Sequence, residues 1–307
     1  MQIGFGAPVS GVWATPENLA SFAARAEAAG YASLWTFQRL IVPEGAAMEP
    51  VYHSVLDPVA ALGFLAAVTQ RIRLGVAVIN MPYLAPGYLA KMAASVDVLS
   101  RGRLDLGLGI GWMPEEFALA GAEMAHRGPK TREYLEVLRH AWSGRLTSYQ
   151  GRYYQVPPGR IAPPPVQRPG PPILLGGIVP AALQRAGRYA DGWVTSSRTD
   201  LSRITDGITV VRAAAEEAGR DPDTIRIVCR GVVRAGAPVT VPEGGGRRLL
   251  SGSYADIRAD AEWLAERGVT ELFYDLNWDP LIGSPDVDHA AAVARAGEIM
   301  AALAPGR

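Results

Sequence analysis

The amino-acid sequence predicts an α/β protein that folds as a (β/α)8 barrel, or TIM barrel. Strand and helix signals alternate along the whole chain, as in proteins built from repeated strand-helix-strand units. The predicted strands are mostly apolar and lack a period of two, which is typical of parallel strands buried on both faces. Roughly eight of them can be counted, the number that closes a parallel barrel.

The first half of the chain contains four predicted strands and the helices between them. Thr15, Pro16 and Glu17 form a typical helix start, with an N-cap, a first-turn proline and a first-turn acid. Asp57 and Pro58 mark the start of the second helix in the same way. The strands are expected over residues 2–7, 31–36, 72–79 and 104–109, and the helices over 16–29, 58–70 and 86–99.

An insertion interrupts this alternation after the fourth predicted strand. Residues 144–172 are rich in proline and aromatic side chains and are too long for an ordinary loop between a strand and a helix. We expect an insertion of about residues 112–172 that covers one end of the barrel and includes helices near Glu115 and over 130–142. The remaining strands are expected over 172–175, 192–196, 225–233 and 270–275, and the remaining helices over 180–189, 202–218, 254–267 and 286–303.

An open doubly wound sheet is the alternative architecture for such an alternation. That fold usually carries a glycine-rich phosphate turn directly after its first strand. Here Ala7, Pro8, Val9 and Ser10 follow the first strand instead. The barrel is therefore preferred, as a single domain of residues 1–307.

The composition excludes several kinds of partner. The 30 basic and 30 acidic residues cancel, which leaves no electrostatic footprint for nucleic acid or an anionic membrane. The longest apolar run, residues 59–68, is shorter than the roughly 20 residues that span a bilayer, and residues 1–6 resemble a strand rather than a leader. The single cysteine, Cys229, is interpreted as an inert buried thiol and is consistent with a reducing compartment. We expect a cytoplasmic protein with a small-molecule partner and no nucleic-acid or membrane partner.

Small residues gather where the predicted strands end. Glycine at such a position lets a flat ligand approach the backbone closely. The carboxyl ends of parallel strands are also where enzymes of this architecture hold a cofactor. The cofactor-binding candidates at strand ends are Gly6, Asn80, Gly109 and Gly111.

Gly176, Gly177 and Ile178 form a second candidate site, directly before the helix expected at Pro180. Glycines at a helix start expose backbone N–H groups, and the positive end of the helix dipole favours a phosphate there. An ordinary left-handed turn explains the two glycines equally well. Both interpretations stay open at this point.

Tryptophan and histidine side chains supply further candidates. Trp112 follows a predicted strand end and is expected to form a pocket wall, whereas Trp193 lies either near a bound ring or in the core. His53 and His126 could reach the barrel mouth, but no histidine has the spacing of a metal site, and no metal is expected. A glycine-rich loop at residues 244–248 is interpreted as a solvated connector, because it lacks the Lys-Ser/Thr of a nucleotide P-loop.

A series of motifs in consistent order resembles the luciferase-like flavin monooxygenase superfamily. The match runs over residues 3–275, nearly the whole chain, and is most similar to the branch that uses the deazaflavin coenzyme F420. The motifs that carry it occupy residues 74–78, 86–91, 97–103, 106–112, 176–177, 190–193 and 218–222.

This resemblance implies several features of the site. Relatives bend the end of the third strand into a bulge with a cis peptide between non-proline residues, and the tricyclic ring rests against it. Carried over, this is the bond between Ala77 and Val78. The glycine turn would bind the cofactor phosphate, and Phe37 and Tyr83 would lie on the substrate side. A homodimer is also implied.

One departure from the family pattern follows the second strand. Many relatives have an acidic residue and then a histidine that acts as an acid or base, whereas this chain has Gln38 and Arg39. Neither side chain is a plausible general base near neutral pH. Arg39 could bind a carboxylate, a phosphate or an acidic ring, or it could form a salt bridge at the strand end. The candidate catalytic residues are Gln38, Arg39, His53 and Trp112.

The resemblance thus implies an oxidoreductase that transfers a hydride between coenzyme F420 and a small organic substrate. The alternative enzyme is an FMN-dependent monooxygenase that uses molecular oxygen. A third hypothesis, a non-catalytic deazaflavin-binding protein, follows from the replacement at Gln38 and Arg39.

Overall fold

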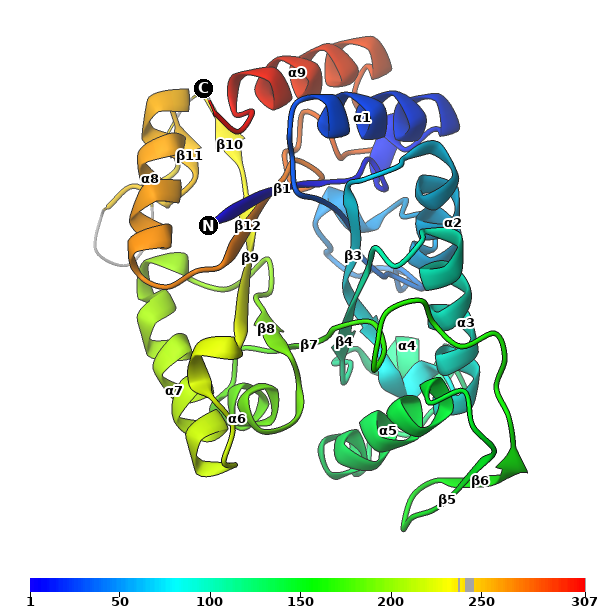
Figure 1. The fold of residues 1–307 in the computed structure, drawn as a ribbon. Coiled ribbons are helices and arrows are strands. Elements are labelled where there is room, and N and C mark those ends of the chain that lie inside the picture. The colour runs from blue at the N-terminus through cyan, green and yellow to red at the C-terminus, as the bar shows by residue number, and fades with distance from the viewer. Residues whose placement is uncertain (237, 241–245, 307) are drawn as a thin grey trace.

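The computed structural model describes residues 1–236, 238–240 and 246–306. Eight parallel strands close into a barrel in the order β1-β12-β9-β8-β7-β4-β3-β2 (Figure 1). They are β1 (Gln2–Gly6), β2 (Ser33–Thr36), β3 (Arg73–Asn80), β4 (Leu104–Gly109), β7 (Ile173–Gly176), β8 (Gly192–Val194), β9 (Arg226–Val232) and β12 (Glu271–Asp275). These eight strands coincide with the eight predicted ones, which confirms the (β/α)8 fold.

Helices form a ring around this barrel (Figure 1). They are α1 (Pro16–Ala28), α2 (Pro58–Val68), α3 (Pro86–Leu99), α4 (Pro114–Leu119), α5 (Arg127–Trp142), α6 (Pro180–Tyr189), α7 (Ile204–Glu217), α8 (Tyr254–Glu266) and α9 (His289–Ala302). The Thr15 hydroxyl accepts a hydrogen bond from the Asn18 N–H at 3.2 Å, and Asp57 caps α2 in the same way. Within the described ranges, each helix is too short or too polar to cross a membrane.

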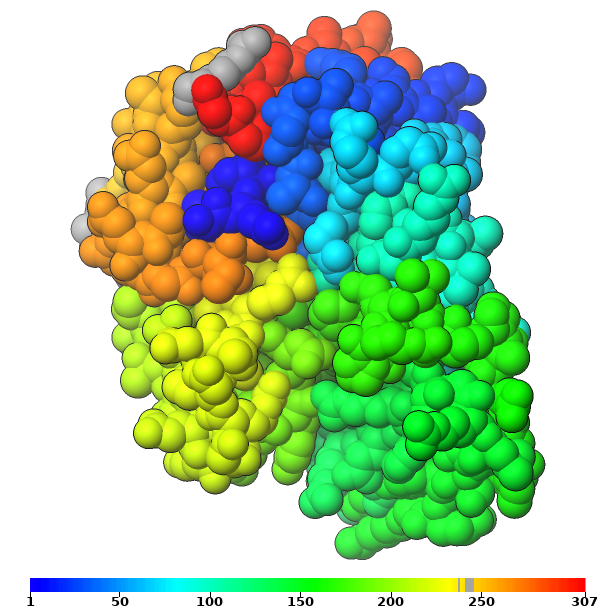
Figure 2. Space-filling view, in the orientation of Figure 1, coloured from blue at the N-terminus to red at the C-terminus, as the bar shows by residue number. Residues whose placement is uncertain are grey.

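Side chains fill the N-terminal end of the barrel. The first residues of the chain lie near the centre of the face drawn in Figure 2. Inside the barrel, Trp35 stacks on Phe273 with ring centroids 5.0 Å apart. A Cβ atom on Gly75 would lie 2.4 Å from the Trp35 ring, so β3 needs a glycine beside the indole. The interior is therefore a packed core rather than a channel.

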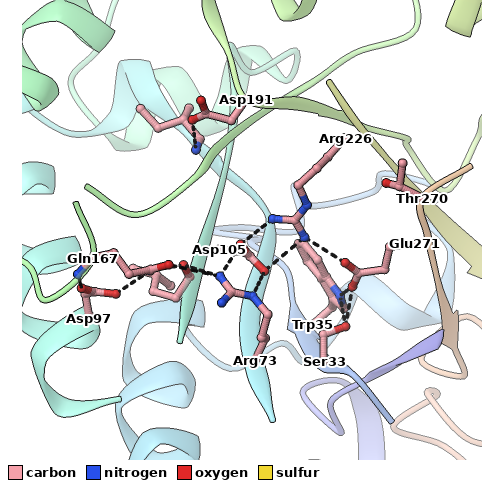
Figure 3. Close-up of polar contacts among 12 residues, drawn as sticks. Ser33, Trp35, Arg73, Asp97, Asp105, Gln167, Asp191, Arg226, Thr270 and Glu271 are labelled. Atoms are coloured by element: carbon pink, nitrogen blue, oxygen red, sulfur yellow. Dashed lines mark hydrogen bonds and ion pairs between the residues drawn. The ribbon is translucent and has the colours of Figure 1, made fainter. Parts of the chain in front are cut away.

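A charged cluster lies at the same end of the barrel (Figure 3). Asp105 is 0% exposed, and its carboxylate lies 2.7 Å from both the Arg73 and the Arg226 guanidinium. Arg226 also pairs with Glu271 at 2.9 Å, and Glu271 accepts a hydrogen bond from the Trp35 indole at 2.8 Å. Burial raises the pKa of Asp105, but hydrogen bonds and charges from the two arginines outweigh burial and hold that pKa below its ordinary value.

This lowered pKa predicts a specific acid sensitivity. Because the Asp105 carboxyl has a lower pKa in the folded protein than in the unfolded chain, its ionised form stabilises the fold. That stabilisation is fully present above the unfolded carboxyl pKa of about 4 and is lost as the pH falls further. In urea unfolding at pH 7 to pH 3, we expect the wild type to lose stability more steeply than Asp105→Asn below about pH 4. Parallel pH profiles for the two proteins would contradict this account.

The insertion after β4 adds α4 and a hairpin of β5 (Thr147–Gln150) and β6 (Gln155–Gly159). The hairpin lies beyond α5, away from the barrel (Figure 1). Tyr149 donates to Glu136 of α5 at 2.7 Å, and Glu133 of α5 accepts from the hairpin turn. The expectation that the insertion covers one end of the barrel is therefore wrong for the hairpin, because the carboxylates of α5 anchor it to the outer side of that helix.

A small two-stranded ladder follows β9. It pairs β10 (Arg234–Ala235) with β11 (Ser251–Gly252) in parallel. Of the glycine-rich loop expected at residues 244–248, Gly244 and Gly245 lie outside the described residues. Its basic end is not a solvated connector, since Arg247 makes a two-pronged ion pair with Asp260 of α8 at 2.6 and 2.7 Å.

Cys229 of β9 is fully buried, and burial raises the pKa of its thiol. A thiol reagent needs both access and a thiolate. We expect 5,5′-dithiobis(2-nitrobenzoate) to leave the native protein unmodified and to label one thiol per chain in denaturant. Rapid labelling of the native protein would contradict the burial of Cys229 in β9.

Candidate active site

A cavity of about 340 Å³ opens at the C-terminal ends of the barrel strands. Active sites of (β/α)8 enzymes lie at this end, and the volume falls in the range of small-molecule sites. Twelve of the predicted site residues line it: Phe37, Gln38, Arg39, Ala77, Val78, Asn80, Gly109, Gly111, Trp112, Gly176, Gly177 and Ile178.

The bulged end of β3 forms one wall of the cavity. The register between β3 and β4 shifts between Val76 and Ile79, and the peptide bond between Ala77 and Val78 is cis, as the resemblance implied. A Cβ atom on Gly107 would lie 2.0 Å from the Val76 carbonyl oxygen. Gly109 is similarly close to Val78, at 2.7 Å. The glycines of β4 therefore make room for the bulge, and Gly109 also lines the cavity, where contact with a bound ligand remains a prediction.

Gln38 connects the ends of three strands. Its side-chain oxygen accepts a hydrogen bond from the Asn80 N–H at 2.9 Å, and the Asn80 side chain accepts one from the Gly111 N–H at 3.0 Å. These bonds join the segments that follow β2 and β4 to the bulged end of β3. Gln38 thus stabilises the shape of the cavity wall through these hydrogen bonds. This is a structural role, and it does not require a side chain that exchanges a proton.

Arg39 forms a buried ion pair at the cavity edge. Its guanidinium lies 3.0 Å from Glu116 of α4, and the two side chains are 6% and 2% exposed. The same guanidinium lies over the rings of Tyr52, at 4.3 Å, and Trp112, at 5.3 Å. Tyr83 donates to Glu116 at 3.1 Å, and burial and this carboxylate raise the pKa of its phenol. Of the two interpretations of Arg39, the structure shows the salt bridge.

Arg230 of β9 was not predicted as a site residue, although it is the one charged side chain in the apolar run 227–233. It is 6% exposed and donates a hydrogen bond to the carbonyl oxygen of Ala77. Its Nε lies 3.4 Å from Asp275 at the end of β12. Burial lowers the pKa of Arg230 and raises that of Asp275. The pair links β9 and β12 to the bulge of β3.

The glycine turn, residues 176–178, follows β7, the fifth barrel strand along the chain, and lines the cavity. Gly177 has a φ of +150°, and a Cβ atom there would lie 2.4 Å from the Ala182 side chain. Trp193 supports the turn, since its indole donates to the Gly177 carbonyl at 2.9 Å. Among the described residues, the N–H groups of Gly177 and Ile178 have no acceptor. They stand before α6, where an anion is favoured.

Four predicted residues do not line this cavity. Gly6 packs against Asp275, and Trp193 is 2% exposed beneath the glycine turn. His53 is exposed, whereas its neighbour Tyr52 lines the cavity. Tyr83 lines a neighbouring cavity behind Gly111. His126, the other histidine considered, precedes α5 and stacks on Tyr153 of the insertion.

The lining also contains residues that sequence reasoning missed. They are Tyr52, Ile110, Arg127, Val179, Ala182, Val194, Thr195, Ser196, Ser197, Arg198, Arg230 and Trp278. Among the described lining residues there are four arginines and no carboxylate or imidazole. Across the described ranges, no group of acidic, histidine or cysteine side chains is arranged to hold a metal. Arg39 and Arg230 are paired with Glu116 and Asp275, so the positive charge of the lining comes from Arg127 and Arg198. The cavity therefore suits an anionic, partly aromatic ligand.

Comparison with known proteins decides the family. The family model described as luciferase-like monooxygenase matches residues 3–240. The chain belongs to the luciferase-like monooxygenase family. This finding confirms the superfamily resemblance that the sequence motifs carried.

Curated relatives match part of their length. An uncharacterised protein of Mycobacterium tuberculosis is 37% identical over 171 residues, which cover 55% of this chain and 60% of that one. A protein of Nakamurella multipartita named F420-dependent glucose-6-phosphate dehydrogenase is 32% identical over 231 residues, which cover 73% of this chain and 65% of that one. The chain thus spans 60 to 65% of the length of these two relatives.

Solved structures share the fold over almost the whole chain. The monooxygenase RslO1 from Streptomyces bottropensis superposes with a TM-score of 0.75 at 20% identity, covering 99% of this chain and 98% of its own. An F420-dependent secondary alcohol dehydrogenase with an F420-acetone adduct gives 0.74 at 19% identity and covers 98% of both chains. Similarity at this level of identity shows a common fold.

Proposed function

We propose that this protein is an oxidoreductase that binds coenzyme F420 in the barrel-mouth cavity and transfers a hydride between it and a small organic substrate. The observation that carries the proposal is the cavity itself, bounded by the bulged end of β3 and by the glycine turn before α6. The relative named F420-dependent glucose-6-phosphate dehydrogenase supports the choice of cofactor.

The residues present fit a deazaflavin. Phe37, Trp112 and Trp278 supply aromatic surface for a flat ring. The positive lining suits an acidic ring system and a phosphate, and the unpaired N–H groups of Gly177 and Ile178 give the phosphate a place to bind.

F420, when bound, supplies the carbon that gives or accepts the hydride. The chain contributes position and surroundings. Ala77 and Val78 would support one face of the ring, Gly176 and Gly177 would hold the phosphate, and Trp112 would close the substrate side against water. Arg230 keeps the bulge in place through the Ala77 carbonyl.

Among the described lining residues, no carboxylate or imidazole is present to transfer a proton, and Tyr52 is the one phenol. Gln38 and Arg39 are committed to Asn80 and Glu116, and neither exchanges a proton near neutral pH. We infer that solvent supplies or takes up the proton, with exposed His53 as the alternative that the sequence suggested. The homodimer and the cytoplasmic location also remain predictions, which light scattering and cell fractionation would test.

The second candidate function is an FMN-dependent monooxygenase. Two solved structures with this fold are monooxygenases, RslO1 and a long-chain alkane monooxygenase of TM-score 0.73 at 16% identity, covering 100% of this chain and 96% of its own. A phosphate-bearing flavin would suit the same cavity. Oxygen uptake with reduced FMN would support this alternative, and tight F420 binding without turnover of any substrate would support a binding protein.

The test is a titration of the purified protein with F420 and, separately, with FMN. Trp112 and Trp278 line the cavity, so quenching of tryptophan fluorescence reports binding there. We expect saturable F420 binding at least about tenfold tighter than FMN binding, a difference of about 1.4 kcal/mol. Binding of FMN alone would overturn the choice of cofactor.

A further inference from the structure

A second cavity, of about 550 Å³, adjoins the first. The two share Ser197, Arg198, Arg230 and Trp278 as walls. The two cavities are therefore neighbours, and a molecule that reaches past these shared side chains would occupy both. The second cavity, here called the arginine chamber, is lined by Arg198, Arg230, Arg234, Arg247 and Arg248, with Glu49 and Asp200 as its carboxylates among the described residues.

Two of these arginines are neutralised by carboxylates outside the chamber lining. Arg247 is held by Asp260, with contacts of 2.6 and 2.7 Å. Arg230 pairs with Asp275 at 3.4 Å. Of the two lining carboxylates, Asp200 is engaged by the backbone N–H and hydroxyl of Ser202, at 3.0 and 2.7 Å.

Arg234 and Arg248 have only weak partners. Within the described ranges, Arg234 donates to the Val233 carbonyl at 3.4 Å and Arg248 to the Ser197 carbonyl at 3.5 Å, and neither lies within ion-pair distance of a carboxylate. The nearby Asp279 is already paired with Arg295 at 2.9 Å.

The positive charges of the Arg234 and Arg248 guanidinium groups also repel each other. Burial lowers the pKa of Arg234, and the charge of Arg248 also lowers it, whereas the carboxylates of Asp279, Glu49 and Asp275 raise it. The pKa of Arg234 nevertheless stays below its ordinary value, so two positive charges share one poorly solvated space. Like charges in such a space are costly unless an anion joins them. Two guanidinium groups match the charge and the oxygen geometry of one dianionic phosphate.

We propose that the arginine chamber binds the phosphate group of an anionic substrate through Arg234 and Arg248, while the reacting carbon lies in the adjoining barrel-mouth cavity. This inference rests on the proposed function, because it places the substrate beside the ring of F420. It adds a substrate class, small phosphate monoesters, that the redox site alone does not define.

The experiment measures binding of inorganic phosphate to the full-length protein by titration calorimetry. Arg234→Gln and Arg248→Gln should each weaken phosphate binding at least about tenfold. Arg145→Gln is the matched control, since it removes the same charge from an exposed position that does not line the chamber and should leave binding unchanged. Arg234→Lys, which keeps the charge, should bind more tightly than Arg234→Gln. Thermal unfolding of each variant verifies that it is folded.

Each outcome decides the proposal. Phosphate binding that persists in saturating F420 and depends on both arginines supports it. Absence of phosphate binding, or equal binding by the wild type and both glutamine variants, overturns it. Displacement of phosphate by F420 would also overturn it, because the chamber would then hold the cofactor's own anionic tail. F420 titration of the same samples tests the proposed function separately, since phosphate can bind Arg234 and Arg248 even if F420 does not bind.

Discussion

Replacing Gly177 by aspartate should weaken F420 binding by at least about 30-fold, or about 2 kcal/mol. Gly177 has a φ of +150°, and an added Cβ atom would lie 2.4 Å from the Ala182 side chain, so the turn would have to move. The new carboxylate would also repel a phosphate at the start of α6. Fluorescence titration with F420 gives the affinity of the wild type and of the variant.

The matched control for this variant is Gly87→Asp. Gly87 lies in the first turn of α3, where an added Cβ atom meets nothing within 4 Å, and it does not line the barrel-mouth cavity. An acid is tolerated in the first turn of a helix, so Gly87→Asp should bind F420 as the wild type does. Unchanged F420 affinity in a folded Gly177→Asp protein would remove the phosphate site from the glycine turn.

Replacing Asp105 by asparagine should lower the free energy of unfolding by about 3 kcal/mol. The change leaves the Arg73 and Arg226 guanidinium groups without the buried carboxylate that both contact at 2.7 Å. Arg226 retains Glu271, and both arginines are about a quarter exposed, so the loss should fall at the lower end of the range for a broken buried pair. Chemical denaturation of the two proteins measures the difference.

Asp206→Asn supplies the comparison for a surface ion pair. Asp206 pairs with Arg203 at 2.9 Å, but the two side chains are 63% and 75% exposed, and such pairs contribute little. We expect no measurable change in the unfolding midpoint. If Asp105→Asn also left the unfolding midpoint unchanged, the charged cluster at the N-terminal end of the barrel would not stabilise the fold.

The sequence was sufficient to predict the barrel and much of its mouth. Apolar strands without a period of two are a local signal, and all eight barrel strands carry it. The glycine turn at Gly177 is marked by a short continuous motif, whereas the cis bond after Ala77 was implied by the family resemblance. The structure adds a role for the β4 glycines that the sequence did not show, since the bulge of β3 lies against Gly107.

Contacts between distant segments could not be predicted in this way. Arg230 contacts Ala77 across 153 positions of the chain, and closure of the barrel alone brings them together. The sequence also could not predict which side chains of a loop face the cavity, since Tyr52 lines the cavity while the adjacent His53 is exposed. The arginine chamber likewise joins residues from β9, β10 and the loop after β8, which no single motif marks.

A crystal structure of the protein with F420 tests the central claim most directly. We expect electron density for the flat ring against Ala77 and Val78, and for its phosphate on the N–H groups of Gly177 and Ile178. Density for F420 at another place on the barrel, with the cavity between β3 and the glycine turn left to solvent, would contradict the proposed site and the hydride transfer assigned to it.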